Sequence, residues 1–301
     1  MLDQSDVHFE LEGLVASASP TGDSASFYSE LFDAECAPEL SRRTRWNNLK
    51  QPGTREPDKS FCSVLDRIEA SVGRQAVVLE IGGGIYQTRC CNAYERFENY
   101  IPLDLSASSI RRYAQRYGRH GIIADATRLP IRSGSVDAVF TRTFLEHVPR
   151  PELALSEIRR VLRPGGIVVH QDAWFCRWWH RFGVVGLVPW SAMTLRERAI
   201  YLASRCTEFP PARAAVILGR RLLREAFCAS SNSLAYRKLR PNYRLHLGCD
   251  EDAASSIDPA EVLRHYCANG CDVGGYASSM HRVLFRGRRI EARMKVGVAQ
   301  A

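Results

Sequence analysis

The spacing of apolar residues changes from a helical to a strand-like pattern close to residue 77. In residues 61–71 the apolar side chains recur three or four positions apart, which predicts an amphipathic helix. Val77–Ile81 is instead a short apolar run that contains a single charge, Glu80, and it leads directly into Gly82, Gly83 and Gly84. We therefore expect a buried strand that ends in a glycine-rich turn.

Short apolar runs then alternate with helical patterns as far as residue 172. Alternation of this kind predicts an α/β fold, in which a parallel sheet carries helices on both of its faces. Ligands of such sheets bind outside the carboxyl ends of the strands. The expected strands after the first are Tyr100–Leu103, Ile122–Ala124, Val136–Phe140 and Ile167–His170, and the expected helices are Ser106–Tyr117, with Ser106 as its N-cap, and Pro151–Leu162.

The alternation breaks at Ala173, where an aromatic and basic stretch begins. It contains Trp174, Phe175 and three further tryptophans, and it predicts helices over Leu195–Ser204 and Ala214–Phe227. A helix over Ile257–Ala268 and a strand over Met280–Phe285 are expected to follow. We divide the chain into an acidic N-terminal segment with lid helices (1–60), a core (61–172), a helical insertion (173–250) and a C-terminal completion of the sheet (251–301).

Charge is distributed unevenly over the 301 residues, whose net charge is +8 and whose pI is about 9.1. Residues 1–41 hold nine acidic side chains and no Lys or Arg, whereas residues 173–248 hold 13 basic and three acidic side chains. A basic surplus is typical of a protein with an anionic partner such as a phosphate, a nucleotide, nucleic acid or a membrane surface. A solvated Arg-rich surface is an equally good interpretation.

Membrane-spanning, secreted and metal-binding classes are disfavoured. The longest apolar run, Val184–Trp190, is too short to cross a bilayer, and the acidic N-terminus does not resemble a secretory signal, so we expect a cytoplasmic protein. The ten cysteines are scattered and are expected to be reduced thiols. Cys249, Cys267 and Cys271 with His265 fit no metal-ligand spacing well, so no metal is expected.

Two acidic positions near the first turn favour a nucleoside ligand. Glycines at a strand-to-helix turn let the backbone approach a ligand closely. Asp104 ends the second strand, 24 residues after Glu80, and a carboxylate there suits the two hydroxyls of a ribose. These two features alone are also typical of nicotinamide dehydrogenases.

Several motifs in residues 77–172 together resemble the class I S-adenosylmethionine-dependent methyltransferases, and among them the ubiquinone-biosynthesis and small-molecule O-methyltransferases. The resemblance implies a Rossmann-like fold with a mostly parallel seven-stranded sheet. The one departure is Tyr86, which stands where the family has the last glycine of its first motif. Beyond the first strand and turn, the motifs are Asp125–Pro130, Gly134–Phe140, Phe144–Val148 and Leu155–Gly166.

The resemblance also implies which residues bind the cofactor, S-adenosylmethionine. The first turn would lie near the methionine part of the cofactor, Asp104 would bind the ribose hydroxyls, and Asp125 would meet the adenine amino group. Many of the remaining motif residues, such as Asp137, Glu157 and Arg160, are expected to stabilise the fold rather than to bind the cofactor. The full set of implied cofactor-binding residues is Glu80, Gly82, Gly83, Gly84, Asp104, Leu105, Asp125, Ala126, Thr141, Arg142 and Thr143.

Methyl transfer to a neutral hydroxyl benefits from a general base. His170 ends the fifth predicted strand, where side chains face the ligand crevice, and His147 follows the fourth. Packing at the start of a helix is the structural alternative for His147. Asp172 would orient His170 or bind a metal, although no second carboxylate cluster supports a metal.

The aromatic and basic insertion is interpreted as a cover for the acceptor, because aromatic rings stack on sugars and Arg binds phosphates. An ordinary hydrophobic core is the competing interpretation. The segment Asp250–Pro259 is similar to segments of surface-polysaccharide and glycoside methyltransferases. We therefore predict O-methylation of a small-molecule or glycan-type acceptor, including an anionic one.

Two other functions compete with this prediction. An RNA methyltransferase would explain the high pI, but the chain has no RNA-binding module, so a nucleic-acid partner is disfavoured. A non-catalytic partner protein of the same fold would not need the intact cofactor motif. A nicotinamide dehydrogenase would leave residues 125–166 unexplained.

Overall fold

A computed structural model describes residues 59–83, 93–176, 210–228, 233–239, 253–273 and 290–295, with a few single positions between 195 and 241. Its helices are α4 (Lys59–Val72), α6 (Ala93–Arg96), α7 (Ala107–Tyr117), the 3-10 helix η2 (Leu145–His147), α8 (Pro151–Val161), α10 (Pro210–Cys228) and α11 (Pro259–Ala268). Its strands are β1 (Val77–Ile81), β2 (Asn99–Asp104), β3 (Ile122–Ile123), β4 (Val136–Arg142), β5 (Leu162–Gln171), β6 (Tyr236–Lys238), β7 (Ser255–Ile257), β8 (Cys271–Val273) and β9 (Ile290–Met294).

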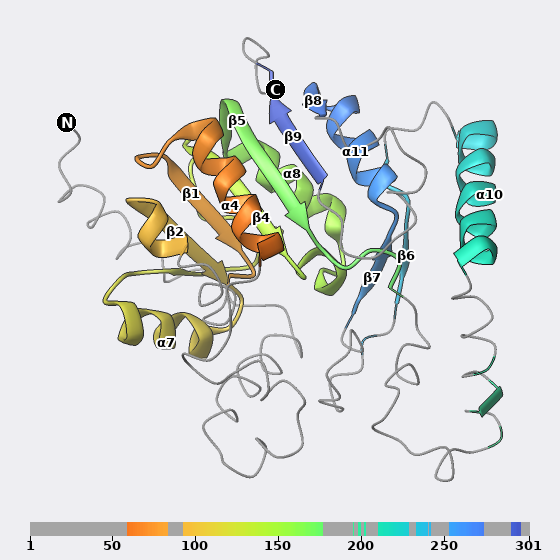
Figure 1. Cartoon of the computed structure of the whole chain (residues 1–301), viewed down its shortest axis with the longest axis horizontal. Coiled ribbons are helices and arrows are strands. Elements are labelled where there is room, and N and C mark those ends of the chain that lie inside the picture. The colour runs from red at the N-terminus through yellow and green to blue at the C-terminus, as the bar shows by residue number, and fades with distance from the viewer. Residues whose placement is uncertain are drawn as a thin grey trace.

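Seven of these strands form one sheet in the order β3-β2-β1-β4-β5-β9-β8 (Figure 1). The first five strands are parallel, and β9 lies antiparallel between β5 and β8. The strand order reverses between β1 and β4, so the chain crosses to opposite sides there and leaves a crevice at the carboxyl edge. The predicted mostly parallel, seven-stranded α/β sheet is confirmed.

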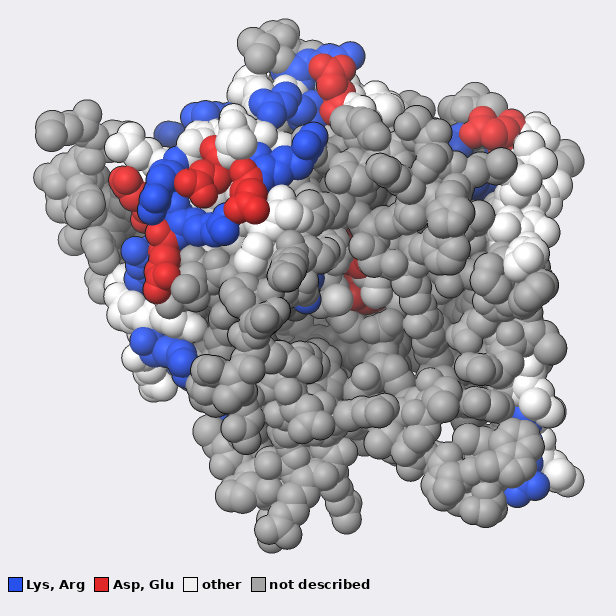
Figure 2. Space-filling model, in the orientation of Figure 1, with Lys and Arg blue, Asp and Glu red and all other residues white. Residues whose placement is uncertain are grey.

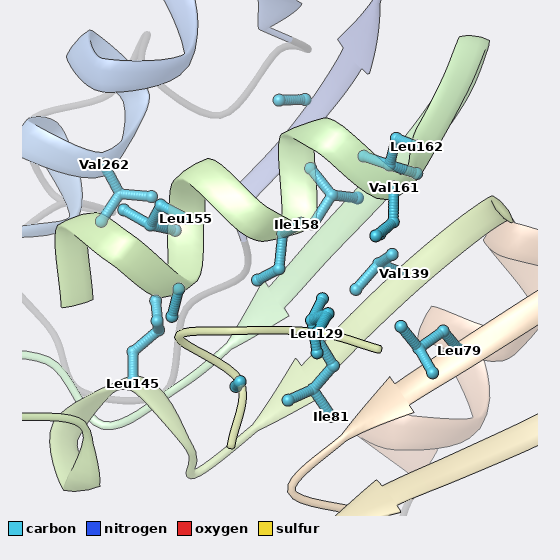
Figure 3. Close-up of a cluster of buried hydrophobic side chains, with 14 of the residues drawn as sticks. Leu79, Ile81, Leu129, Val139, Leu145, Leu155, Ile158, Val161, Leu162 and Val262 are labelled. Carbon is cyan, nitrogen blue, oxygen red and sulfur yellow. The ribbon is translucent and has the colours of Figure 1, made fainter. Parts of the chain in front are cut away.

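Alternate residues of the strands contribute their side chains to two separate hydrophobic cores, one on each face of the sheet. Val78, Ala138 and Val169 pack under α4, whereas Leu79, Val139 and Val168 face α8 and α11. Figure 3 shows Ile158 and Val161 of α8 pointing at the strand residues, with Val262 of α11 beside Leu155. Strands buried on both faces are typical of a parallel sheet covered by helices.

The helix ends follow the expected signals. Ser106 caps α7 by accepting a hydrogen bond from the Ser109 amide (3.2 Å), and Asp258 caps α11 by accepting one from the Ala260 amide (2.8 Å). α10 covers the predicted helix over 214–227.

Several strands differ from the prediction: besides β5 and β9, the three-residue strands β6, β7 and β8 were not expected. β5 begins at Leu162, directly after α8, rather than at Ile167, and the pairing with β4 shifts register between Val136 and Ala138. β9 was not predicted, although its apolar residues alternate with Glu291 and Arg293, which is the pattern of a half-buried strand. The strand predicted over Met280–Phe285 lies outside the described residues, as do Trp178, Trp179, Trp190 and Cys249.

The residues assigned to scaffold in Leu155–Gly166 and at Asp137 do hold the core together. The Glu157 carboxylate accepts hydrogen bonds from Arg160 (2.7 Å) and from the Leu129 amide (2.7 Å). Arg160 also donates to the carbonyls of Leu129 and Ile131, so this pair ties the loop before β4 to α8. Asp137 accepts the Val77 amide (2.6 Å) and thereby joins the starts of β4 and β1.

α10 is attached to the rest of the chain through its charged side. Arg221 pairs with the Asp258 carboxylate (2.5 Å) and Arg224 with Glu261 (3.4 Å), both on or next to α11. The opposite side of α10 carries exposed apolar residues, among them Leu222 (62% exposed) and Leu223 (59%). Figure 1 shows the helix standing at one side of the molecule, and Figure 2 shows mostly uncharged atoms there.

Charges of both signs alternate on the described surface in front of α4 (Figure 2). Arg96 contacts Asp66 (2.5 Å), and Arg74 contacts Glu69 (4.0 Å). The basic surplus of the chain is therefore not concentrated on this part of the surface. None of the described helices is long and apolar enough to span a bilayer. Cys62, Cys176, Cys267 and Cys271 are free thiols.

Candidate functional site

The carboxyl edge of the sheet brings together most of the residues implied as cofactor-binding. In the register of the strands, Ile81 lies opposite both Leu103 of β2 and Thr141 of β4. The turn at Gly82, the carboxylate of Asp104 and the end of β4 are consequently neighbours at one edge. Asp125 and Ala126 reach the same edge, because the Ala124 amide donates to the Asp104 carbonyl (3.1 Å). Gly84 lies outside the described residues.

The glycine turn after β1 has no space for side chains. Gly82 has a φ of +72°, and a Cβ there would lie 2.9 Å from the Phe144 ring. A Cβ at Gly83 would lie 2.7 Å from Glu80 Cγ. Both amides donate to the Leu103 carbonyl, at 2.8 and 3.2 Å. The turn is therefore pressed between β2 and Phe144, with a backbone that a ligand can approach closely.

Glu80 is a buried carboxylate beneath this turn, 1% exposed. Burial raises the pKa of Glu80 well above its usual value, an effect that the Arg142 charge opposes and the Asp104 charge reinforces. The Tyr100 hydroxyl donates to Glu80 Oε2. Among the described residues Oε1 has no hydrogen-bond partner, so one oxygen of this buried group is left for a donor from a ligand or water.

Asp104 and Asp125 each use one carboxylate oxygen to hold a local turn. Asp104 Oδ1 accepts the Ser106 amide (2.8 Å), and Asp125 Oδ1 accepts both the amide and the hydroxyl of Thr127 (2.8 Å each). Both side chains are half-buried, as is Leu105, whereas Ala126 is buried. These turns fix the direction of each carboxylate at the edge where a nucleoside would lie.

The segment after β4 is held in an unusual conformation. Thr143 has a φ of +46°, which is rare for a residue with a Cβ and is typical of functional sites. The Gln171 carbonyl accepts its amide (3.3 Å), and Asp172 Oδ1 accepts the next amide, that of Phe144 (3.0 Å). β5 and Asp172 therefore fix the chain that follows Thr141 and Arg142 and that presses Phe144 against Gly82.

The two histidines predicted as general bases have different surroundings. His170 is fully buried, and both ring nitrogens are engaged: Nδ1 lies 2.7 Å from the Thr141 hydroxyl and Nε2 lies 2.8 Å from the Tyr266 hydroxyl. The side chain of His147, on η2, is 21% exposed, and its Nε2 lies 3.7 Å from a Glu146 carboxylate oxygen. A catalytic role for either residue stays a prediction, and the geometry favours His147 as the one with access to solvent.

Other residues of the site and its supports were not singled out from the sequence. Tyr100 bonds Glu80, which lies 20 residues away in the sequence, and Tyr266 bonds His170, which lies 96 residues away. Phe144 approaches Gly82 only in the folded chain. No local pattern could have indicated them. Trp174 is fully buried in the core beneath α8 and α11, so this member of the aromatic cluster is a core residue.

The described residues fit S-adenosylmethionine. A tight turn at Gly82 and Gly83, a buried carboxylate oxygen without a partner at Glu80, and a carboxylate at the end of β2 lie along one edge. The turn and the Glu80 oxygen match the methionine part of a nucleoside cofactor, and the carboxylate at the end of β2 matches its ribose. No group of three or more potential metal ligands occurs in the part of the chain that the structure describes.

Comparisons with known proteins give the same result. Residues 79–170 match the methyltransferase domain family. Relatives include an uncharacterized chloroplastic methyltransferase of Arabidopsis thaliana, 30% identical over 47% of this chain and 42% of that protein. A probable phthiotriol/phenolphthiotriol dimycocerosates methyltransferase of Mycobacterium ulcerans is 31% identical over 42% of this chain and 50% of that protein. A malonyl-[acyl-carrier protein] O-methyltransferase of a Marinomonas species is 34% identical over 35% of this chain and 42% of that protein.

Each of these relatives matches less than half of this chain. The chain spans half or less of the length of each of the three proteins. The residues matched by the family model, 79–170, nevertheless include β1 from Leu79 onward, the carboxyl ends of β2 and β4, and all the described residues implied as cofactor-binding. Fold, edge and family match agree: the chain carries a class I, S-adenosylmethionine-dependent methyltransferase domain.

Proposed function

We propose that the protein transfers a methyl group to an oxygen of a small-molecule or glycan-type acceptor, bound over the carboxyl edge of the sheet beneath residues 173–250. One observation carries this proposal. The insertion leaves the core at the end of β5, and the ribbon of β6, which lies in the insertion, and β7, which follows it, contacts the loop after β4. The Ala254 amide donates to the Glu146 carbonyl (2.7 Å), and the Ser255 hydroxyl donates to the Leu145 carbonyl (3.0 Å).

This attachment makes the insertion a neighbour of the methyl-donor side of the site. The Phe175 amide also donates to the Ile257 carbonyl (3.0 Å), so the start of the insertion lies beside β7, the strand that follows the insertion. A cover at this place excludes water and orients an acceptor, and such positioning supplies several kcal/mol in group-transfer reactions.

The cofactor supplies a methyl carbon that is already activated by the sulfonium, so the protein mainly aligns the donor with the acceptor and excludes water from between them. Glu80 and Asp104 bind and orient the cofactor, and the fixed segment after Thr141 limits the space around the transferred methyl group. We assign proton removal from a hydroxyl acceptor to His147, because its ring reaches solvent and the Glu146 carboxylate lies beside it. His170 has no ring nitrogen left for an acceptor.

Oxygen as the accepting atom has support from one relative, whose name describes an O-methyltransferase. The basic surplus of residues 173–248 favours acceptors that carry a phosphate or carboxylate, such as nucleotide-linked sugars. RNA, whose backbone carries phosphates, would also bind a basic surface of this kind. The two are separated by their response to salt, since RNA binding weakens steeply with ionic strength.

The test has two stages. Calorimetry with S-adenosylhomocysteine asks whether the cofactor binds at all, and absence of binding would favour a non-catalytic partner protein. Transfer of a labelled methyl group to a panel of nucleotide sugars, free glycosides, hydroxylated aromatics and RNA then identifies the acceptor class. Labelling of RNA alone would refute the small-molecule proposal.

The base assignment is tested with two histidine variants. His147→Ala should lower the rate constant of methyl transfer about 10²- to 10⁴-fold with cofactor affinity unchanged. His120→Ala is the matched control, because His120 is exposed and precedes β3 at the opposite edge of the sheet. Equal rates in both variants would remove His147 from the mechanism.

A further inference from the structure

A chain of four polar side chains runs through the core between the ends of β4 and β5 and helix α11. The Tyr266 hydroxyl lies 2.8 Å from His170 Nε2, and His170 Nδ1 lies 2.7 Å from the Thr141 hydroxyl. The same hydroxyl lies 2.8 Å from Asp172 Oδ2. All four side chains are 1% exposed or less. We call this set the Tyr266–Asp172 relay.

The number of protons available fixes the direction of each hydrogen bond. Thr141 has one hydroxyl proton, and the carboxylate of Asp172 can only accept, so that proton is donated to Asp172. The hydroxyl oxygen must then accept from His170, which places the ring proton on Nδ1. Asp172 Oδ2 lies 3.4 Å from Nδ1, and its negative charge also favours a proton at that nitrogen.

In a ring that carries its proton on Nδ1 alone, Nε2 is an acceptor, and the Tyr266 hydroxyl supplies its donor. Burial raises the pKa of Tyr266 well above its usual value, so the hydroxyl keeps its proton at any working pH. The tyrosine and histidine rings also stack, with centroids 5.7 Å apart and planes inclined by 28°. With a single proton on the His170 ring, every hydrogen bond of the relay then has one donor and one acceptor.

The relay ends at the cofactor turn. The second oxygen of Asp172 accepts the Phe144 amide (3.0 Å), and the Phe144 ring is what closes the space at Gly82. We propose that Tyr266 is a positioning residue for the methyl-donor site: it fixes the tautomer of His170 and, through Thr141 and Asp172, the place of Phe144 against Gly82. This inference rests on the proposed function, because it concerns the geometry of that site.

The first readout is the position of the ring proton. Side-chain ¹⁵N spectra of the histidines in the full-length protein at pH 8, assigned with a His170→Gln sample, should show His170 protonated at Nδ1 alone. In Tyr266→Phe, Nε2 loses its donor and the proton is free to move to it. A wild-type ring that carries a proton on Nε2 would overturn the proposal without any variant.

The second readout is calorimetric affinity for S-adenosylhomocysteine. Tyr266→Phe should weaken binding about three- to tenfold, the usual effect of one hydrogen bond. Tyr113→Phe is the matched control, since Tyr113 is an equally buried tyrosine on α7, away from the relay. Equal affinities in the two variants would overturn the proposal, because a role in stability alone predicts that result.

A third pair of variants keeps the test decisive if Tyr266→Phe does not fold. Thr141→Ser retains the hydroxyl that links His170 to Asp172 and should keep the wild-type ¹⁵N spectrum of His170, whereas Thr141→Val removes that hydroxyl and should change the spectrum. Identical behaviour of the two would again overturn the proposal. A wild-type protein that binds no S-adenosylhomocysteine would refute the proposed function instead, while its ¹⁵N spectrum would still show whether the relay has the inferred tautomer.

Discussion

Replacing Gly82 by alanine should damage the site through two separable effects. The first is the left-handed backbone, with a φ of +72°, which costs an alanine about 1–2 kcal/mol relative to glycine. The second is steric: the new Cβ would lie 2.9 Å from Phe144 Cδ2 and 3.2 Å from its Cβ. The Phe144 amide is held by Asp172, so the ring has little room to move. Overpacking of this kind costs about 1–3 kcal/mol.

Gly118→Ala separates the two effects. Gly118 has a φ of +62°, but a Cβ there would meet no atom within 4 Å. The difference in the free energy of unfolding between the two variants, measured by urea denaturation, should therefore be about 1–3 kcal/mol. Only Gly82→Ala should weaken binding of S-adenosylhomocysteine, and adding Phe144→Leu should restore part of the loss. Equal destabilisation in both variants would refute the steric argument.

Three further predictions concern single residues. Asp104→Ala should weaken S-adenosylhomocysteine binding by roughly 10- to 100-fold in calorimetry, the range for a hydrogen bond to a charged group; equal affinity would remove Asp104 from the ribose site. Trp174→Ala should lower the free energy of unfolding by about 3–5 kcal/mol, because its side chain is 1% exposed and packs in the core under α8 and α11. Hydrogen bonds from Arg160 lower the pKa of Glu157, so this carboxylate stabilises the fold above its unfolded pKa and loses that effect as the pH falls through its folded pKa. Urea titrations between about pH 5 and 3 should consequently show a steeper loss of stability in the wild type than in Glu157→Gln; parallel curves would contradict the assigned role.

Much of the core was predictable because its signals are local. A run such as Val77–Ile81, a cap such as Ser106 and a turn such as Gly82 carry their conformational preferences within a few residues. The position of Asp104 at the cofactor edge followed from strand order, since parallel strands end at the same side. These elements were placed correctly without any long-range information.

The supports of the site were not predictable, because they depend on register and on distant packing. The bond between Tyr100 and Glu80 exists only when β2 pairs with β1, and the bond between Tyr266 and His170 joins residues 96 positions apart. His170 shows the consequence. Its place at the end of a strand predicted access to a ligand, whereas α11 covers that side of the sheet and makes the ring a buried link.

The inner position of β9 has a consequence for how the protein is made. β5 is complete at Gln171, but its antiparallel neighbour begins only at Ile290. Ribosomes add about 5–20 residues per second, so the nascent chain presents an open β5 edge for roughly ten seconds. Unpaired edges recruit other strands, and this interval is when the growing chain is most exposed to aggregation. Slower translation between β5 and β9 would lengthen that exposure, and chaperones that cover strand edges would be needed during it.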